Sequence, residues 1–273
     1  CLQKAALPQE KVQLALAGDL QAQCTASSYA MRELGVPFAG LFGACSTMTE
    51  GLALGAALCE GGAVRNLLAM ASSHFCAAER QFRTPLSYGA VRTPTAQWTA
   101  TAAGCCLLQP QGEGVGIAAA TFGRVQDYQV KDINNMGAAM APAAASTLLH
   151  YFKDTGTEPQ EFDCIYTGDL GQVGSQLLRE LLAAEGLLIK NHVDCGCILF
   201  DANEQSVKSG GSGPGCCAAV LCGHILPRLR RGSQKRVLFT ATGALMSQTT
   251  FLQKETIPAV AHLVELRAPE KEK

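Results

Sequence analysis

The chain has 273 residues, a formal net charge of −1, and 16% charged against 48% hydrophobic residues. A chain of this length can bury a large core, which argues against a peptide, a disulfide-stapled scaffold or a disordered tail. The balanced charge lacks the basic excess that a phosphate backbone requires, so we expect no nucleic acid partner. The composition, with 28 glycines, is that of a globular protein with a large interior and many tight turns.

Thirteen cysteines are present, and the odd number leaves at least one thiol unpaired in any disulfide scheme. Most of them lie in apolar or Gly/Ala-rich context, where a thiol behaves as a small hydrophobic group. We therefore expect reduced cysteines in the core and a reducing compartment. The sequence has no signal peptide and no run of about 18 apolar residues, so we expect a soluble, cytoplasmic chain.

Apolar periodicity and Gly or Pro breakers predict strands that alternate with helices, which indicates an α/β fold. The predicted strands, in chain order, are 12–18, 37–42, 66–72, 103–108, 115–122, 162–168, 194–200, 214–222 and 236–242. The predicted helices are 25–34, 46–60, 139–153 and 174–186. Residues 84–95 and 128–137 read as long loops, which in a compact domain are usually functional or interfacial.

Two pairs of segments repeat along the chain. An apolar run ends in Gly-Asp-Leu at 18–20 and again at 168–170. The run GACSTMTEGLALGAAL is followed by RNLLAMASSH in the first half, and GPGCCAAVLCGHIL is followed by KRVLFTATGAL in the second. These repeats predict a duplicated α/β unit, with halves at 1–135 and 136–267 and a charged tail at 268–273.

Cys45 differs from the other twelve cysteines in its setting. The run PFAGLFGACSTMTEG predicts a strand, a Gly turn and a helix that begins just after the thiol. A helix N-terminus lowers the pKa of a thiol, and the small neighbours Gly43 and Ala44 leave room for a ligand. Cys45 is therefore a candidate nucleophile, and the alternative is a buried cysteine in a tight turn.

The candidates for a partner of Cys45 are histidines and arginines. His74 follows an apolar strand, at the strand end where ligands collect in α/β sheets, and His262 lies in an apolar strand pattern. Arg80 and Arg83 follow His74 closely, and a guanidinium is a natural partner of a carboxylate. The alternative for each of them is a surface or structural role.

Metal and nucleotide sites are not predicted. Residues His192, Asp194, Cys195 and Cys197 have suitable atoms for zinc but lack Cys-x-x-Cys spacing, and in a strand the two cysteines would simply fill core. The Gly-rich run 209–215 lacks the Lys-Ser/Thr of a phosphate loop. We therefore predict no metal and no cofactor.

A series of motifs in a fixed order carries a family resemblance across almost the whole chain. The motifs are AGDL (17–20), GVPFAGLFGACST (35–47), ASSH (71–74), AERQFR (78–83), MGAAMAPAAA (136–145), TGDL (167–170), VGS (173–175), GGSG (210–213), ATGAL (241–245) and QKETIPAVAH (253–262). The chain resembles the thiolase-like condensing enzymes and, among them, the AD family of stage V sporulation proteins. The resemblance implies a thiolase-like α/β fold with duplicated halves in αβαβα layers, here without the first strand and helix of the family.

The same resemblance implies a role in binding. Members of this sporulation family are dimeric, lie at the spore inner membrane with the other stage V A proteins, and bind dipicolinic acid for uptake into the developing spore. A homodimer, the stage V A proteins and dipicolinic acid, free or as its calcium chelate, are therefore the expected partners. Cys45, His74, Arg80, Arg83 and His262 are the expected ligand-binding residues.

The resemblance also implies that catalysis is lost. Cysteine-dependent condensing enzymes bring His and Asn, or two His, to the thiol, and Asp169 and Gly211 are expected at those two places. Neither can donate to a developing oxyanion, so Cys45 would be a vestigial nucleophile. One alternative is an active acyltransferase or 3-ketoacyl synthase that uses Cys45 with His74 or His262. Another is a scaffold whose role lies only in its protein contacts.

Overall fold

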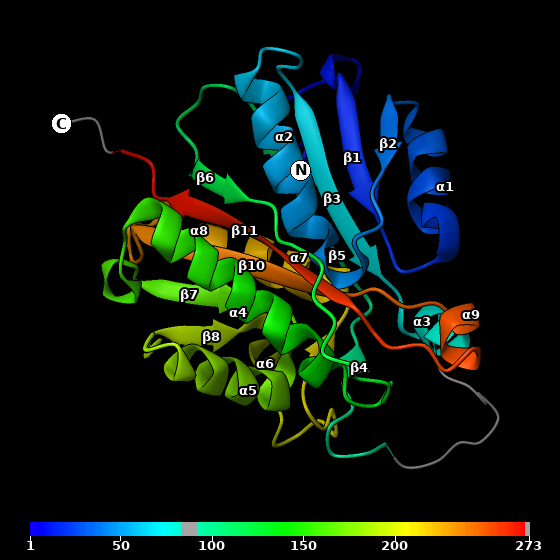
Figure 1. Ribbon diagram of the computed structural model, residues 1–273. Helices are drawn as coiled ribbons and strands as arrows, with labels where there is room; N and C mark the ends of the chain where they lie inside the picture. Colours follow the sequence, from blue (N-terminus) through cyan, green and yellow to red (C-terminus); the bar gives the residue numbers. More distant parts are fainter. Residues whose placement is uncertain (83–91, 271–273) are drawn as a thin grey trace.

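The computed structural model describes residues 1–82 and 92–270, and its strands form two main sheets (Figure 1). The first sheet has the order β2 (Phe38–Gly40), β1 (Leu14–Gly18), β3 (Leu67–Ser73) and β5 (Ala102–Leu108). Strand β1 is parallel to β2 and β3, whereas β5 is antiparallel to β3. Strand β1 is almost wholly buried because α-helices cover both faces of the sheet, which explains its continuous apolar run.

The second sheet has the order β6 (Gly116–Thr121), β11 (Ala259–Arg267), β10 (Arg236–Ala244), β7 (Cys164–Thr167) and β8 (His192–Asp194). Strand β7 is parallel to β8 and β10, and β11 is antiparallel to β10 and β6. The order β8-β7-β10-β11, with its strand directions, therefore repeats the order β2-β1-β3-β5 of the first sheet. The predicted duplication is confirmed.

Two elements tie the halves together. Strand β6 lies before the predicted boundary at 135/136, yet it pairs with β11 of the second sheet. Strands β4 (Trp98–Thr99) and β9 (Gly211–Ser212) form a small parallel pair between the halves. The position of the domain boundary stays a prediction.

The helices complete five layers. They are α1 (Thr25–Leu34), α2 (Thr47–Glu60), α3 (Phe75–Phe82), α4 (Met136–Thr155), α5 (Gly171–Ala184), α6 (Cys195–Leu199), α7 (Pro214–Val220), α8 (Leu226–Arg230) and α9 (Gln248–Leu252), with a π-helical segment η6 (Leu221–Ile225) between α7 and α8. Helices α2 and α7 pack between the two sheets, α4 and α5 cover the outer face of the second sheet, and α1 packs on the outer face of the first. The predicted αβαβα arrangement is confirmed.

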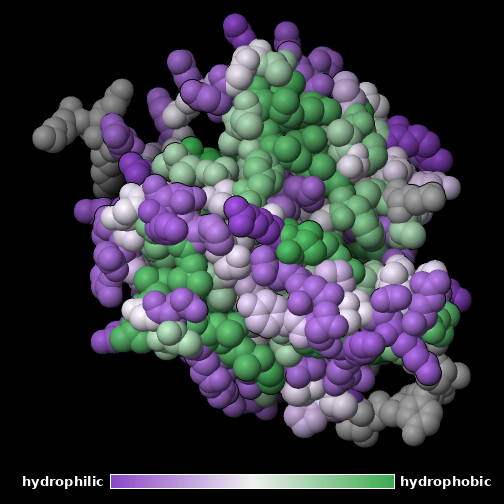
Figure 2. Space-filling model, in the orientation of Figure 1, coloured by the Kyte–Doolittle hydropathy of each residue, from purple (hydrophilic) through white to green (hydrophobic). Residues whose placement is uncertain are grey.

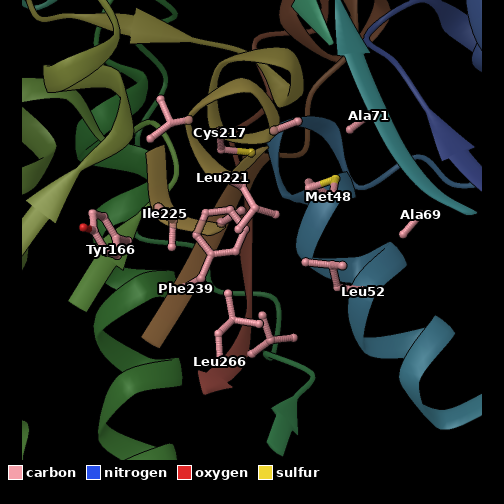
Figure 3. Close-up of a cluster of buried hydrophobic side chains, with 14 of the residues drawn as sticks. Met48, Leu52, Ala69, Ala71, Tyr166, Cys217, Leu221, Ile225, Phe239 and Leu266 are labelled. Carbon is pink, nitrogen blue, oxygen red and sulfur yellow. The ribbon is translucent and has the colours of Figure 1, made fainter. Parts of the chain in front are cut away.

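The central core depends on the period-two alternation of the strands. Phe239 of β10 faces the middle layer, where it packs among Met48, Leu221 and Ile225 (Figure 3). The next residue back, Leu238, faces α4 in the outer core. One strand therefore supplies both cores, because successive side chains point to opposite faces. Apolar surface also gathers over α2 on the face in view (Figure 2).

Two predicted strands are helical. Residues 194–200 contain only the end of β8, after which the Asp194 side chain accepts a hydrogen bond from Cys197 N and begins α6. Residues 214–222 form α7 and enter η6, with Pro214 at the first helical position. A short apolar run cannot distinguish a strand from a buried helix, and here the capping residues decide. Cys195 and Cys197 therefore do not share a strand face.

Other elements lie outside the prediction. Apolar periodicity predicts neither the helices α3, α8 and α9 nor β8 as a separate strand. Strand β11 is indicated only by the apolar strand pattern around His262. Among the described residues, the helices are too short or too polar for any of them to cross a bilayer.

A buried ion-pair network closes the second sheet on α4. The Glu265 carboxylate is 2% exposed and accepts from Arg236 Nε at 2.8 Å, from Arg267 Nε at 2.6 Å and from the Tyr151 hydroxyl. Burial by itself would raise the pKa of Glu265, but the hydrogen bonds from Arg236, Tyr151 and Arg267 outweigh it and hold the pKa at about 2. The charged carboxylate therefore stabilises the fold.

This network predicts an acid-sensitive stability. Because the folded pKa of Glu265 lies below its ordinary value of 4.5, its contribution is complete above about pH 5 and is lost as the pH falls towards 2. Glu265→Gln should lower the free energy of unfolding at pH 7 by about 3 kcal/mol and flatten this part of the pH profile in urea titrations. Glu60→Gln, at the exposed end of α2, makes the same charge change and should alter neither the free energy of unfolding at pH 7 nor its pH profile. Equal profiles for wild type and Glu265→Gln would contradict the role of the carboxylate.

Candidate functional site

A pocket of about 340 Å³ opens beside Cys45, at the ends of β9 and β10. Helices α3 and α9 and the segment 133–140 line its other sides. Its walls are mostly apolar, with side chains from Leu20, Phe42, Ala44, Ala78, Phe82, Ala96, Ile133, Met136, Met140, Ala244, Leu245 and Met246. Its polar lining consists of Cys45, Glu79, Gln97, Thr99, Asn134, Ser212, Ser247 and Thr250. This volume and character suit a small, largely apolar ligand.

Cys45 lies in a short 3₁₀ turn immediately before α2, as the sequence predicts. Ala44 has φ = +50°, and the Ser46 hydroxyl donates to Gly43 O at 2.7 Å, so the turn is tightly held. From the second half, Cys217 Sγ lies 3.6 Å from Cys45 O. The thiol is therefore fixed where the two halves meet.

The side chains opposite the thiol come from the second half. The Ser212 Oγ lies 4.0 Å from Cys45 Sγ and donates a hydrogen bond to Asp169 at 3.0 Å. Asp169 is fully buried and also accepts from Gly213 N at 2.8 Å and from the Thr242 hydroxyl at 3.3 Å. Burial raises the pKa of Asp169 to about 6 in spite of these donors. A carboxylate and a hydroxyl thus face Cys45.

The thiol is not activated, contrary to the expectation from its place before a helix. Burial raises the pKa of Cys45 well above its ordinary value, and the negative charge of Asp169 raises it further. Desolvation and a nearby anion both disfavour the thiolate, and together they outweigh the N-terminal end of α2. Cys45 is therefore a protonated thiol at neutral pH.

The second expected partner position shifts by one residue. A Cβ on Gly211 would meet Cys216 Sγ at 3.1 Å and the Phe200 ring at 3.1 Å, so this position points into the core. The pocket-lining residue of β9 is Ser212, and it faces the thiol. The correction follows from the alternation along a strand, which sends neighbouring residues to opposite sides.

His74, Arg80 and His262, the expected cationic residues that the structure describes, do not line this pocket. His74 is exposed and lines a separate cavity with Asp19, and Arg80 is exposed on α3. His262 lies in β11, where its Nδ1 accepts from Gly123 N at 3.2 Å and burial lowers its pKa. Arg83 lies outside the described residues. Among the described lining residues none is Lys, Arg or His, so the place of Arg83 stays a prediction.

Gln97 is a site residue that sequence reasoning missed. Its Nε2 donates to Asp169 O at 2.5 Å and to Gly211 O at 3.0 Å, which joins the two segments that face Cys45. Its Oε1 is buried and has no hydrogen-bond partner among the described residues. Gln97 precedes the single tryptophan of the chain, but no local pattern marks it, because its partners are distant in sequence.

A second missed feature supports the pocket wall. Arg92 forms an ion pair with Glu79 at 2.8 Å, and its guanidinium lies 4.2 Å from the Trp98 ring centroid. Phe75 stacks on Trp98 with ring centroids 4.6 Å apart. Because both charged side chains are nearly buried, this cluster holds α3 against β4 beside the pocket.

The described surroundings of Cys45 can be compared with what cysteine chemistry and metal binding require. A nucleophilic thiol needs a base and oxyanion donors, and the described residues around Cys45 include no imidazole. No group of three His, Cys, Asp or Glu side chains within 1–82 and 92–270 is placed to hold a metal ion.

The fold is that of the condensing enzymes. The 3-oxoacyl-[acyl-carrier-protein] synthase III of Aquifex aeolicus VF5 superposes with a TM-score of 0.61 at 14% identity, over 97% of this chain and 80% of that chain. A variant of OleA from Xanthomonas campestris superposes with a TM-score of 0.62 at 14% identity, over 97% and 77%. At this identity the likeness shows a shared thiolase-like fold and nothing of the reaction.

Sequence comparison places the chain within one family of that fold. The family model described as Stage V sporulation protein AD matches residues 1–267. The Stage V sporulation protein AD of Bacillus subtilis (strain 168) is 43% identical over 262 residues, which span 96% of this chain and 77% of that protein. The chain belongs to the Stage V sporulation protein AD family, as its motifs predict.

The contact between Asp169 and Cys45 can be tested through thiol reactivity. Because Asp169 raises the pKa of Cys45, Asp169→Asn should lower that pKa and speed the alkylation of Cys45 by iodoacetamide at pH 8, several-fold. Peptide mass spectrometry resolves Cys45 from the other cysteines. Asp154→Asn removes the same charge from the exposed end of α4 and should leave the rate unchanged. A slower or equal rate in Asp169→Asn would refute the electrostatic assignment.

Proposed function

We propose that this protein is a non-catalytic member of the thiolase-like fold that binds dipicolinic acid beside Cys45 and serves its uptake into the developing spore. The family membership supports the link with sporulation. The observation that carries the binding role is the pocket itself. It keeps a volume of about 340 Å³ and apolar walls, while its thiol faces a hydroxyl and a carboxylate, with no imidazole among the described lining residues.

The electrostatics of the site support binding rather than turnover. An acyl transfer at Cys45 would place a developing oxyanion near the thiol, and the charge of Asp169 would oppose it. The raised pKa of Cys45 leaves little thiolate to begin the reaction. The Ser212 hydroxyl lies beside the thiol, but its proton is already directed to Asp169.

The lining of the pocket favours the calcium chelate of the ligand over its free dianion. Dipicolinic acid is a flat pyridine with two carboxylates, and apolar walls suit the ring. A free dianion would be desolvated between these apolar walls, and the described lining residues include no Lys, Arg or His to offset its charge. The one-to-one calcium chelate carries no net charge. We therefore propose the chelate as the preferred ligand, with hydroxyl and amide groups such as Thr99 and Asn134 as donors to its oxygens.

The partners belong to the proposal as well. We propose a homodimer that sits on the cytoplasmic side of the spore inner membrane with the other stage V A proteins. Three aromatic side chains outside the pocket are exposed: Tyr29 at 60%, Phe122 at 51% and Tyr128 at 60%. Exposed aromatic side chains of this kind are typical of protein interfaces.

Binding can be measured by isothermal titration calorimetry with dipicolinate, once with excess calcium and once with a chelator. Calcium should raise the affinity at least tenfold, because it removes the ligand charge that no described lining residue neutralises. Ala244→Leu, at the pocket end of β10, should weaken the binding of the chelate at least tenfold by filling the pocket.

Two variants serve as controls. Ala57→Leu makes the same change on the exposed face of α2 and should bind as the wild type does. His74→Ala should also bind normally, since His74 lines a different cavity. Unchanged binding in Ala244→Leu would show that this pocket is not the binding site. Equal affinity with and without calcium would be compatible with this pocket as the binding site but would contradict the chelate as the preferred ligand.

The rival function, an acyltransferase or 3-ketoacyl synthase, makes a distinct prediction. Incubation with acetyl-CoA followed by intact-mass measurement should give no acyl adduct, because Cys45 is protonated and lacks an imidazole among its described neighbours. A condensing enzyme with an acylated active-site cysteine is the positive control. A mass gain that maps to Cys45 would establish the enzyme and overturn the binding-only role.

A further inference from the structure

Two cysteines from different halves of the molecule are in contact away from the pocket. Cys106 lies in β5 and Cys222 lies in η6, 116 residues apart in the chain, and their Sγ atoms are 3.9 Å apart. Both are partly exposed, whereas Cys45, Cys195 and Cys217 are buried. A contact between two partly exposed cysteines is different from the core packing expected for most cysteines here.

The local structure explains why the two sulfur atoms meet. Strand β5 pairs on one side with β3, in register Ala69 to Cys106, and the Cys106 side chain packs against the middle layer. The π-helical turn of η6 interrupts the helix after α7 and presents Cys222 to β5, where its Sγ is 3.7 Å from Cys105 O. Such π-helical turns are rare and often occur at functional positions.

The two thiols are chemically unequal. A hydrogen bond from Cys106 is the main cause that lowers the pKa of Cys222 to about 7, and Arg230 and Lys4 add to it. The same pairing raises the pKa of Cys106, so this thiol keeps its proton. At neutral pH Cys222 is therefore partly a thiolate while Cys106 stays a thiol, which is the arrangement of a reactive dithiol.

We propose that Cys106 and Cys222 are a redox modification site, at which a low-molecular-weight disulfide converts the two thiols into an internal disulfide between the halves. The Cys222 thiolate attacks one sulfur of the small disulfide and releases one thiolate, which leaves a mixed disulfide on Cys222. Cys106 then loses its proton to water, attacks the Cys222 sulfur and expels the second small thiolate. Two protein thiols are oxidised to one disulfide, and one small disulfide is reduced to two thiols.

The bond needs a modest movement and has a structural consequence. Side-chain rotation must bring the sulfur atoms from 3.9 Å to about 2.05 Å, the length of a disulfide. The disulfide closes a loop of more than one hundred residues and ties the first sheet to the helix that carries Cys217, the neighbour of Cys45. We expect the thermal midpoint of the oxidised protein to rise by several degrees.

The test uses the fully reduced, full-length chain incubated with excess hydroxyethyl disulfide at pH 8, followed by alkylation and mass spectrometry. The digest should yield one cross-linked peptide pair that contains Cys106 and Cys222 and weighs about 2 Da less than the two free-thiol peptides together. The thermal midpoint should rise with this cross-link and fall back on reduction. Cys106→Ser and Cys222→Ser should abolish the cross-link and the shift.

Two matched cysteine variants test whether the cross-link is specific to this pair. Cys105→Ser removes the adjacent thiol and should leave the cross-link intact, so a link lost in this variant would assign the bond to Cys105 and overturn the proposal. Cys76→Ser removes an exposed cysteine of α3 and should also leave it intact. In the wild type Cys76 reports on the reagent: if Cys76 becomes a mixed disulfide while Cys106 and Cys222 remain thiols, the proposal is wrong. A cross-link between any other pair would overturn it as well.

Discussion

The structure depends on a direct contact between the backbones of its two halves. A Cβ on Gly243 of β10 would lie 2.1 Å from Gly43 O, and a Cβ on Gly215 of α7 would lie 2.2 Å from Ala102 O. Side chains at these positions would force the sheets apart, so only glycine allows this approach. The turn that carries Cys45 is consequently held against β10 and α7 of the other half. The pocket exists because two repeats of one α/β unit meet at this distance.

That contact also determines the chemistry of the thiol. The close approach removes water from Cys45, and the segments that face it bring Asp169 and Ser212 within reach. In water, a thiol before a helix would be more acidic than usual, but in a dry site with a carboxylate it is less acidic. One fold can therefore carry a cysteine in the position of a nucleophile and still hold it as a protonated thiol in the wall of a pocket.

Much of the fold is predictable because local sequence patterns determine it. The helices near 25–34, 46–60, 139–153 and 174–186 and most strands follow from apolar periodicity, and the repeated segments indicate the duplication. The strands predicted at 194–200 and 214–222 are wrong because short apolar runs look alike in strands and buried helices. Their helical state depends on Asp194 and Pro214 at the starts of α6 and α7.

The candidate site is predictable only in part. The motifs of Cys45 and Asp169 indicate both residues: Cys45 lines the pocket, and Asp169 is buried next to the thiol. The second position is predicted one residue early, at Gly211 instead of Ser212, since the side of a strand that faces a pocket depends on its pairing with another strand. His74 and His262 are expected beside Cys45 because each ends or occupies an apolar strand. The pattern does not tell which way a side chain points. His74 lines another cavity, and His262 accepts a hydrogen bond from Gly123 N.

The sequence by itself determined the family, the duplicated α/β class and the identity of the central thiol, because these depend on motif order and on the period of apolar residues. Only the tertiary structure decided that Cys45 is protonated, that Gln97 joins the segments of Asp169 and Gly211, and that Cys106 meets Cys222. Each of these depends on groups tens to more than one hundred residues apart, whose distance and solvation arise when the halves pack together. Charge and reactivity follow from that distance and solvation, and no local pattern records them.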